Sequence, residues 1–227
     1  MGATSVPVTS VAAGVAAELK RATAAGARPE WDFLGRVADQ VARRISRLGS
    51  GPLAELRRTD VAHWGTAAFA RLVGAGGLVA VLVDSTRYSQ AEVFERRKRL
   101  SVCVGAMAHL MTRAYHTRKV PLGRALYRAG FQEERLVGLL HATGDSLLRE
   151  ITGVGLRLAA AEQNADTADL LRLVFDTRYP YPQRVRSQIA MDYYTRQHAQ
   201  VSNPEGAEGS EGAGDAEGLN GQVGSEG

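Results

Sequence analysis

Apolar residues recur at spacings of three and four through most of this chain, and no segment alternates cleanly between apolar and polar residues. The first clear case runs from Leu34 to Leu48, and Gly49 ends it as a C-terminal cap. This spacing places apolar side chains on one face of an α-helix, whereas a half-buried strand needs a period of two. The pattern therefore predicts an all-α protein, a helical bundle or pair of bundles with eight or nine helices.

Two segments test that prediction most directly. Residues 78–83 are apolar and rich in β-branched side chains, but no partner strand is evident, which favours a buried helix. The longest helix is expected over residues 89–114, and the basic loop that follows it separates two predicted bundles. We expect an N-terminal bundle over residues 29–120 and a C-terminal bundle over residues 121–201, after a flexible extension over residues 1–28.

The charge of the chain is divided unevenly between body and tail. Residues 202–227 hold six acids, eight glycines and no base, so residues 1–201 hold 28 bases against 18 acids. A tail with so few apolar side chains cannot offset its ordering entropy, and we expect it to be disordered. The body is therefore basic, and 25 of its bases are arginines, whose planar guanidinium groups suit phosphate.

Several classes of protein are excluded by what the sequence lacks. A single cysteine, Cys103, cannot form an internal disulfide or a cysteine-rich zinc site. No apolar run reaches the ~20 residues of a membrane helix, and no signal peptide is evident, which favours a cytoplasmic protein. The five histidines show no metal-ligand spacing, and nucleophile and dinucleotide motifs are missing. We therefore expect no enzyme, no catalytic residues, no metal and no cofactor.

Four consecutive bases, residues 96–99, fall within the predicted long helix. At about 100° per residue, Arg96 and Arg97 lie beside its apolar face, whereas Lys98 and Arg99 point outward. We expect the first two bases to pack beside the core through their apolar stems and the second two to reach a partner.

Residues 122–130 and 133–140 have the outline of two helices joined at a glycine, as in a helix-turn-helix reader of DNA. That motif needs a small residue four positions before the turn glycine, where Leu126 stands if Gly130 is the turn. A register shifted by one places Ala125 there but puts Ala129 at the turn and Arg135 at a buried position. Neither register fits the motif. A stand-alone helical DNA-binding transcriptional regulator is therefore the alternative function and not the preferred one.

Three segments form a more specific pattern through their order and spacing: GPLAELRR at 51–58, PLGRALYRAG at 121–130 and ERLVGLLH at 134–141. With a long helix and a basic loop between the first two, they resemble the CasB family, the small subunits of the type I-E CRISPR surveillance complex Cascade. The resemblance spans roughly residues 30–200 and leaves out the alanine-rich N-terminus and the acidic tail.

The resemblance implies a non-catalytic all-α subunit of antiviral defence that pairs with a second copy within its complex. It implies basic surfaces that contact nucleic-acid backbone and stabilise the R-loop, especially the displaced DNA strand. The implied partners are crRNA, target DNA and the other Cascade subunits. Since aromatic residues make up only 6% of the chain, we expect phosphate contact to outweigh base stacking.

Ten bases are the candidate nucleic-acid-binding residues. Five lie on segments that match the family, three match more loosely in the C-terminal helices, and two come from the outward face of the long helix. They are, in that order, Arg58, Arg118, Lys119, Arg124 and Arg135; Arg149, Arg184 and Arg186; and Lys98 and Arg99. Ion pairs of Arg124 or Arg135 with Glu133 or Glu134 are the alternative use of those two bases.

Overall fold

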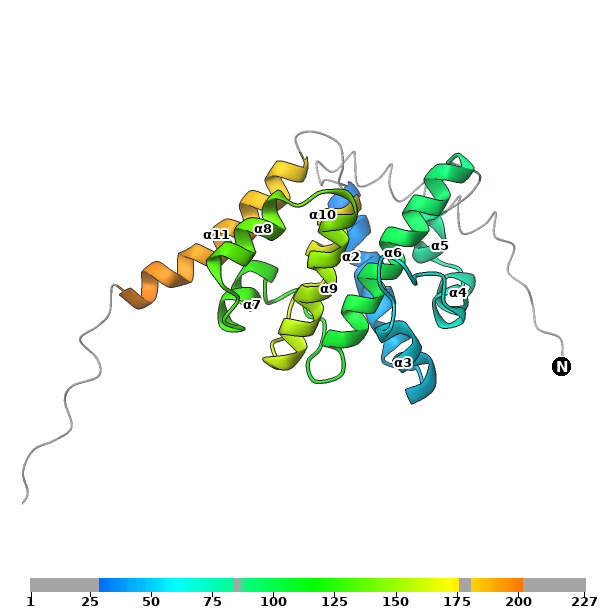
Figure 1. Cartoon of the computed structure of the whole chain (residues 1–227), viewed down its shortest axis with the longest axis horizontal. Helices are drawn as coiled ribbons and strands as arrows, with labels where there is room; N and C mark the ends of the chain where they lie inside the picture. The colour runs from blue at the N-terminus through cyan, green and yellow to red at the C-terminus, as the bar shows by residue number, and fades with distance from the viewer. Residues whose placement is uncertain (1–28, 84–85, 87, 176–180, 202–227) are drawn as a thin grey trace, which may run out of the picture.

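Figure 1 presents the computed structural model of the chain, which describes residues 29–83, 86, 88–175 and 181–201. The predicted extension (1–28) and the predicted disordered tail (202–227) lie outside these residues. Within the described ranges the all-α prediction is confirmed, with ten helices and no strand beyond one bridge between His116 and Ala165. The helices are α2 (Pro29–Ile45), α3 (Ser50–Arg57), α4 (Ala67–Gly74), α5 (Leu78–Leu82), α6 (Gln90–Leu110), α7 (Leu122–Arg128), α8 (Glu133–His141), α9 (Gly144–Ala160), α10 (Ala168–Phe175) and α11 (Tyr181–Val201).

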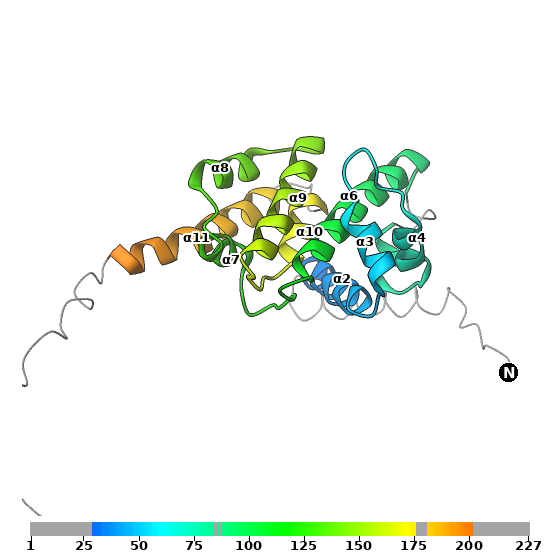
Figure 2. The same cartoon turned by 60° about the horizontal axis from the view of Figure 1, so that its bottom comes forward.

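Helix α6 lies at the centre of the fold, with α9 on one side and α3 on the other (Figure 2). A capping box starts it, in which the Ser89 amide donates to the Glu92 carboxylate at 2.9 Å and the Glu92 amide donates to the Ser89 hydroxyl at 3.3 Å. From Leu100 to Ala108 every residue of α6 is buried. A helix that is covered all round belongs to the core, so α6 has no single apolar stripe in this half.

Two predicted elements near α6 can be compared with the structure. The apolar segment at 78–83 forms helix α5, as predicted, with Val79 and Leu82 buried. Helix α6 ends at Leu110, four residues before the predicted end. The next residues form turns with backbone hydrogen bonds between residues three apart, such as that from the Thr112 amide to the His109 carbonyl. The Thr112 hydroxyl also donates to the His109 carbonyl at 2.7 Å and so completes this end.

Helices α6 and α9 approach each other closely at a glycine. A Cβ atom added to Gly155 would lie 2.5 Å from the carbonyl oxygen of Ala106 and 2.7 Å from its Cα. Helices α7 and α11 meet in the same way, since a Cβ atom on Gly123 would overlap the Ile189 carbonyl. These contacts require glycine because the opposing atoms are backbone, which no side-chain rotation can move.

The buried residues form one core. The core includes residues of α2, which packs against α5 and α10. It contains residues from both sides of position 120, for example Val41, Leu100 and Leu171. The division into bundles at 29–120 and 121–201 stays a prediction beside this shared core. Among the described helices, none is long and apolar enough to span a membrane.

Candidate nucleic-acid interface

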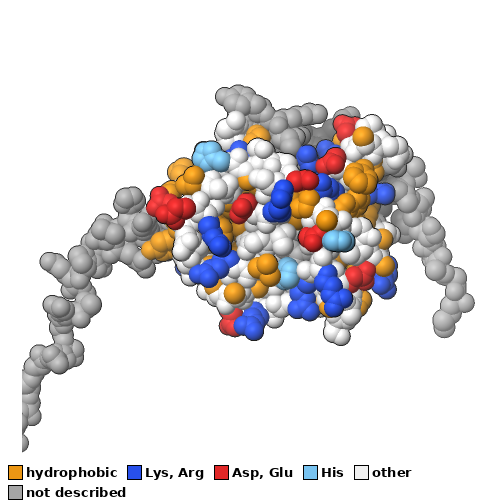
Figure 3. All heavy atoms as spheres, in the orientation of Figure 1, with side chains coloured by type: hydrophobic (Ala, Val, Ile, Leu, Met, Phe, Trp, Pro, Cys, Tyr) orange, Lys and Arg blue, Asp and Glu red, His pale blue; other side chains and the backbone are white. Residues whose placement is uncertain are grey.

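Four of the predicted cations are exposed and have no carboxylate partner among the described residues. Each comes from a different element: the end of α3, the loop before α7, α8 and α9. We call them the exposed cation set: Arg58, Lys119, Arg135 and Arg149. Figure 3 shows Lys and Arg side chains in several separate groups on one face of the molecule. Separate long cations suit phosphate contact, which positions a nucleic acid without reading its sequence.

Several acids, by contrast, are held by internal partners. The Asp39 carboxylate accepts from Arg118 Nη2 at 2.6 Å and from His116 Nε2 at 2.8 Å. The Asp169 carboxylate accepts from Arg172 at 2.7 Å, and the Asp145 carboxylate accepts from a lysine of α6. The exposed cation set therefore keeps positive charge that no carboxylate of the described residues neutralises through an ion pair.

The pKa values of these acids reflect their surroundings. Partial burial acts to raise the pKa of Asp39, but hydrogen bonds from Arg118 and His116 outweigh it and lower that pKa below its usual value. Burial raises the pKa of Asp169, the Asp166 carboxylate raises it further, and Arg172 offsets only part of this effect. Asp39 is consequently ionised at neutral pH, and Arg118 has a permanent internal partner.

The basic loop between α6 and α7 is fastened to the core through His116. The Thr167 amide and hydroxyl lie 3.2 Å and 2.8 Å from His116 Nδ1, while Nε2 faces Asp39. Asp, His and Thr are the residue types of a catalytic triad, but Thr167 is fully buried, so its hydroxyl cannot meet a substrate. The network instead fixes the loop that carries Arg118 and Lys119.

The orientation predicted for residues 96–99 is wrong for three of the four bases. Arg96 packs beside the core as predicted, donating to the Leu82 carbonyl at 3.2 Å. Arg97, however, is exposed, Arg99 is half-buried, and the Lys98 side chain is only 13% exposed with Nζ 2.6 Å from the Asp145 carboxylate. The cause is α9, which packs on the side of α6 predicted to face outward and supplies that carboxylate.

Arg99 and Arg186 lie on the wall of one cavity of about 230 Å³, among residues of α6, α9, α10 and α11. Arg186 donates to the Ala142 carbonyl at 2.9 Å and Arg99 to the Val174 carbonyl at 3.5 Å. Each guanidinium has five N–H donors, so further donors remain. Thr143 and Gly144, at the start of α9, line the same cavity, and the N-terminus of a helix favours anions. The rest of the lining is apolar, so the cavity combines two guanidinium groups and a helix N-terminus with an apolar wall.

The remaining predicted bases on α7 and α11 have different surroundings. Arg124 is half-buried on α7, and its Nε atom is buried without a hydrogen-bond partner in the described part of the chain. Arg184 is exposed on α11. Ion pairs of Arg124 or Arg135 with Glu133 or Glu134 are not found among the described residues. Glu133 instead accepts from the Tyr194 hydroxyl at 2.7 Å.

Two bases that the sequence analysis did not select, Arg157 and Arg97, become candidate nucleic-acid-binding residues in the structure. Arg157 lines a recess of about 210 Å³ together with Arg135, and it donates to the Ala129 and Gly130 carbonyls at the end of α7 at 2.7 and 3.0 Å. Arg97 is exposed with no carboxylate partner among the described residues. No local sequence signal pairs Arg157 with Arg135, because their proximity depends on how α8 packs against α9.

Comparison with known proteins finds a matching family and matching solved structures, two of which follow. The model of the family described as CRISPR-associated protein Cse2 matches residues 52–194. A chain in the crystal structure of E. coli Cascade bound to a PAM-containing dsDNA target is 22% identical with a TM-score of 0.51, covering 70% of this chain and 95% of that one. The crystal structure of CasB from Thermobifida fusca is 20% identical with a TM-score of 0.55, covering 71% and 98%. No curated protein sequence matches significantly.

Proposed function

Because this chain belongs to the family of CRISPR-associated protein Cse2, we propose that it is a non-catalytic small subunit of a type I-E CRISPR RNA-guided surveillance complex. In this role its exposed cations bind nucleic-acid backbone and stabilise the R-loop, with the displaced DNA strand as their main ligand. The fold similarity to a chain of E. coli Cascade, a complex solved with double-stranded DNA, supports the proposal.

The observation that carries the backbone-binding part is the imbalance between cations and acids. The exposed cation set has no carboxylate partner among the described residues, while Asp39, Asp145 and Asp169 are bound by internal cations. Unneutralised cations on several elements attract a polyanion through phosphate contacts, which need charge but no base-reading geometry. The Arg99–Arg186 cavity adds a place where a phosphate can be partly enclosed.

Backbone contacts of this kind can decide whether an R-loop persists. Forming an RNA–DNA heteroduplex in place of a DNA duplex is close to balanced in free energy, and protein contacts to the strands tip it. A subunit that binds the displaced strand therefore opposes its return to the duplex without any chemical step. The proposed partners are crRNA, target DNA, the other subunits of the complex and a second copy of this chain.

Binding of single-stranded DNA to the full chain should fall steeply with salt and depend little on sequence. For single strands log Kd is expected to change by about 0.7 per phosphate contact for each tenfold change in salt. We expect this slope in fluorescence anisotropy between about 50 and 500 mM salt, with similar affinities for oligonucleotides of different sequence. Equal affinity at both salt concentrations would contradict the proposal. A strong preference for one duplex sequence would favour the transcriptional regulator instead.

A further inference from the structure

An aromatic pair lies at the surface of the fold. Phe94 on α6 is 53% exposed, and the centroid of its ring lies 4.9 Å from that of the Trp64 ring, with the ring planes at 87°. This edge-to-face contact uses the edge of one ring and one face of the other, so it does not cover both rings. Trp64 is half-buried, so the two rings form one contiguous apolar surface, and contiguous exposed apolar surface marks binding sites more often than a single exposed side chain does.

The backbone that carries Trp64 is held in place from two sides. The Ser101 hydroxyl of α6 donates to the Trp64 carbonyl, and the Thr66 amide donates to the same oxygen at 3.1 Å. Before it, the Asp60 carboxylate accepts from the Ala62 and His63 amides at 2.8 and 2.6 Å. The loop therefore has a defined conformation without any ligand, which lowers the entropy cost of binding on it.

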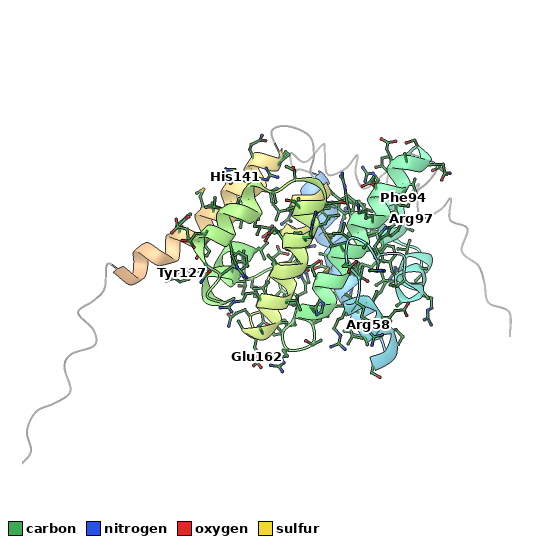
Figure 4. The ribbon with its side chains drawn as sticks, in the orientation of Figure 1. Arg58, Phe94, Arg97, Tyr127, His141 and Glu162 are labelled. Carbon is green, nitrogen blue, oxygen red and sulfur yellow. The ribbon has the colours of Figure 1, made fainter. Side chains whose placement is uncertain are left out.

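The aromatic pair has a cation on its α6 side, while the one acid of the loop before Trp64, Asp60, is bound by the Ala62 and His63 amides. Arg97 follows Phe94 by three residues and so lies on the same face of α6, and both side chains are labelled in Figure 4. It is exposed and has no carboxylate partner in the described part of the chain. The acids of α6, Glu92 and Glu95, lie on another side of the helix, where they line a recess with Phe175.

We propose that Trp64, Phe94 and Arg97, here called the aromatic platform, stack an unpaired base of single-stranded DNA and contact the phosphate next to it. Aromatic rings beside a cation are the combination with which proteins bind single strands without sequence preference. The inference rests on the proposed function and extends it, because it adds base stacking to phosphate contact. It also departs from the sequence-based expectation that stacking is minor in this chain.

The test compares Phe94→Ala in the full chain on two ligands, oligo(dT) and an abasic oligonucleotide of the same length. Stacking is worth about 1–3 kcal/mol per base, so the variant should bind oligo(dT) at least about fivefold more weakly. Its affinity for the abasic strand, which keeps the phosphates, should not change. Met191→Ala is the matched control, since Met191 is 62% exposed on α11 and should affect neither ligand. Thermal unfolding checks that both variants remain folded.

A second readout reports on the platform itself. In a Trp31→Phe background Trp64 is the remaining tryptophan, and oligo(dT) should quench its fluorescence while the abasic strand should not. Equal affinity of the parent for both strands, with no effect of Phe94→Ala, would overturn the platform and leave the proposed function intact. Failure of both strands to bind would overturn the two together. Loss of assembly with other subunits, with unchanged DNA binding, would assign the surface to a protein contact and overturn the inference.

Discussion

Replacing all four residues of the exposed cation set with glutamine should weaken binding of single-stranded DNA by about a hundredfold at constant salt. This follows if each exposed contact contributes somewhat less than about 1 kcal/mol. The slope of log Kd against log salt should also become shallower by up to about 3, because about 0.7 is lost with each phosphate contact on a single strand. The variant should remain folded, since these side chains are exposed and have no carboxylate partner among the described residues.

A pair of double variants controls for the change in net charge. Arg58→Gln with Lys119→Gln and Arg118→Gln with Lys98→Gln each remove one arginine and one lysine. In the second pair both bases are bound by internal acids, Arg118 by Asp39 and Lys98 by Asp145. We expect the first double variant to lose DNA affinity and the second to lose mainly stability. Equal losses of affinity from both would show that net charge matters rather than the placement of the cations.

Gly155→Ala should destabilise the fold by about 1–3 kcal/mol or more, the usual cost of overpacking a core. The added Cβ would lie 2.5 Å from the Ala106 carbonyl oxygen at the contact of α6 and α9, and neither helix backbone can move alone. Unfolding in urea, followed by circular dichroism, measures the change.

Gly153→Ala is the matched control on the same helix. Gly153 is exposed, and a Cβ there would meet no atom within 4 Å. This variant should stabilise the protein by about 0.5–1 kcal/mol, because alanine favours a helix over glycine. The two substitutions are chemically identical and two residues apart, so opposite signs would confirm the packing of α6 on α9. Stabilisation by both would contradict it.

Much of the fold follows from local pattern. The apolar spacing predicts the helical class, and the lack of a partner strand predicts the helix at 78–83, which forms as α5. The order of three short motifs predicts the CasB resemblance, which the family match confirms. The end of α6 and the orientation of its four bases were not predictable in the same way. Because α6 is buried on all sides from Leu100 to Ala108, the apolar residues there do not mark a single face, and the angle of Lys98 measured from them carries no information about α9.

The candidate interface was predicted as ten individual bases, without the partners that each base has in the fold. The sequence identifies the bases, but whether each one is available to bind nucleic acid depends on acids that are distant along the chain. Arg118 and Asp39 are 79 residues apart in the sequence, and Lys98 and Asp145 are 47 apart. Only the folded structure therefore shows that these two bases are paired with acids. Arg58 and Arg135 match the family no better than Arg118, yet the structure leaves them exposed without a carboxylate partner in its described part.

Co-purification shows whether this chain acts as a subunit of an RNA-guided complex. The full chain should be expressed with the other subunits and with CRISPR RNA, one of the other subunits carrying the affinity tag. We predict that the chain is retained with the tagged complex, and that the complex lacking it holds an R-loop for a shorter time. Failure of the chain to associate, with RNA present and the other subunits assembled, would contradict the proposed function.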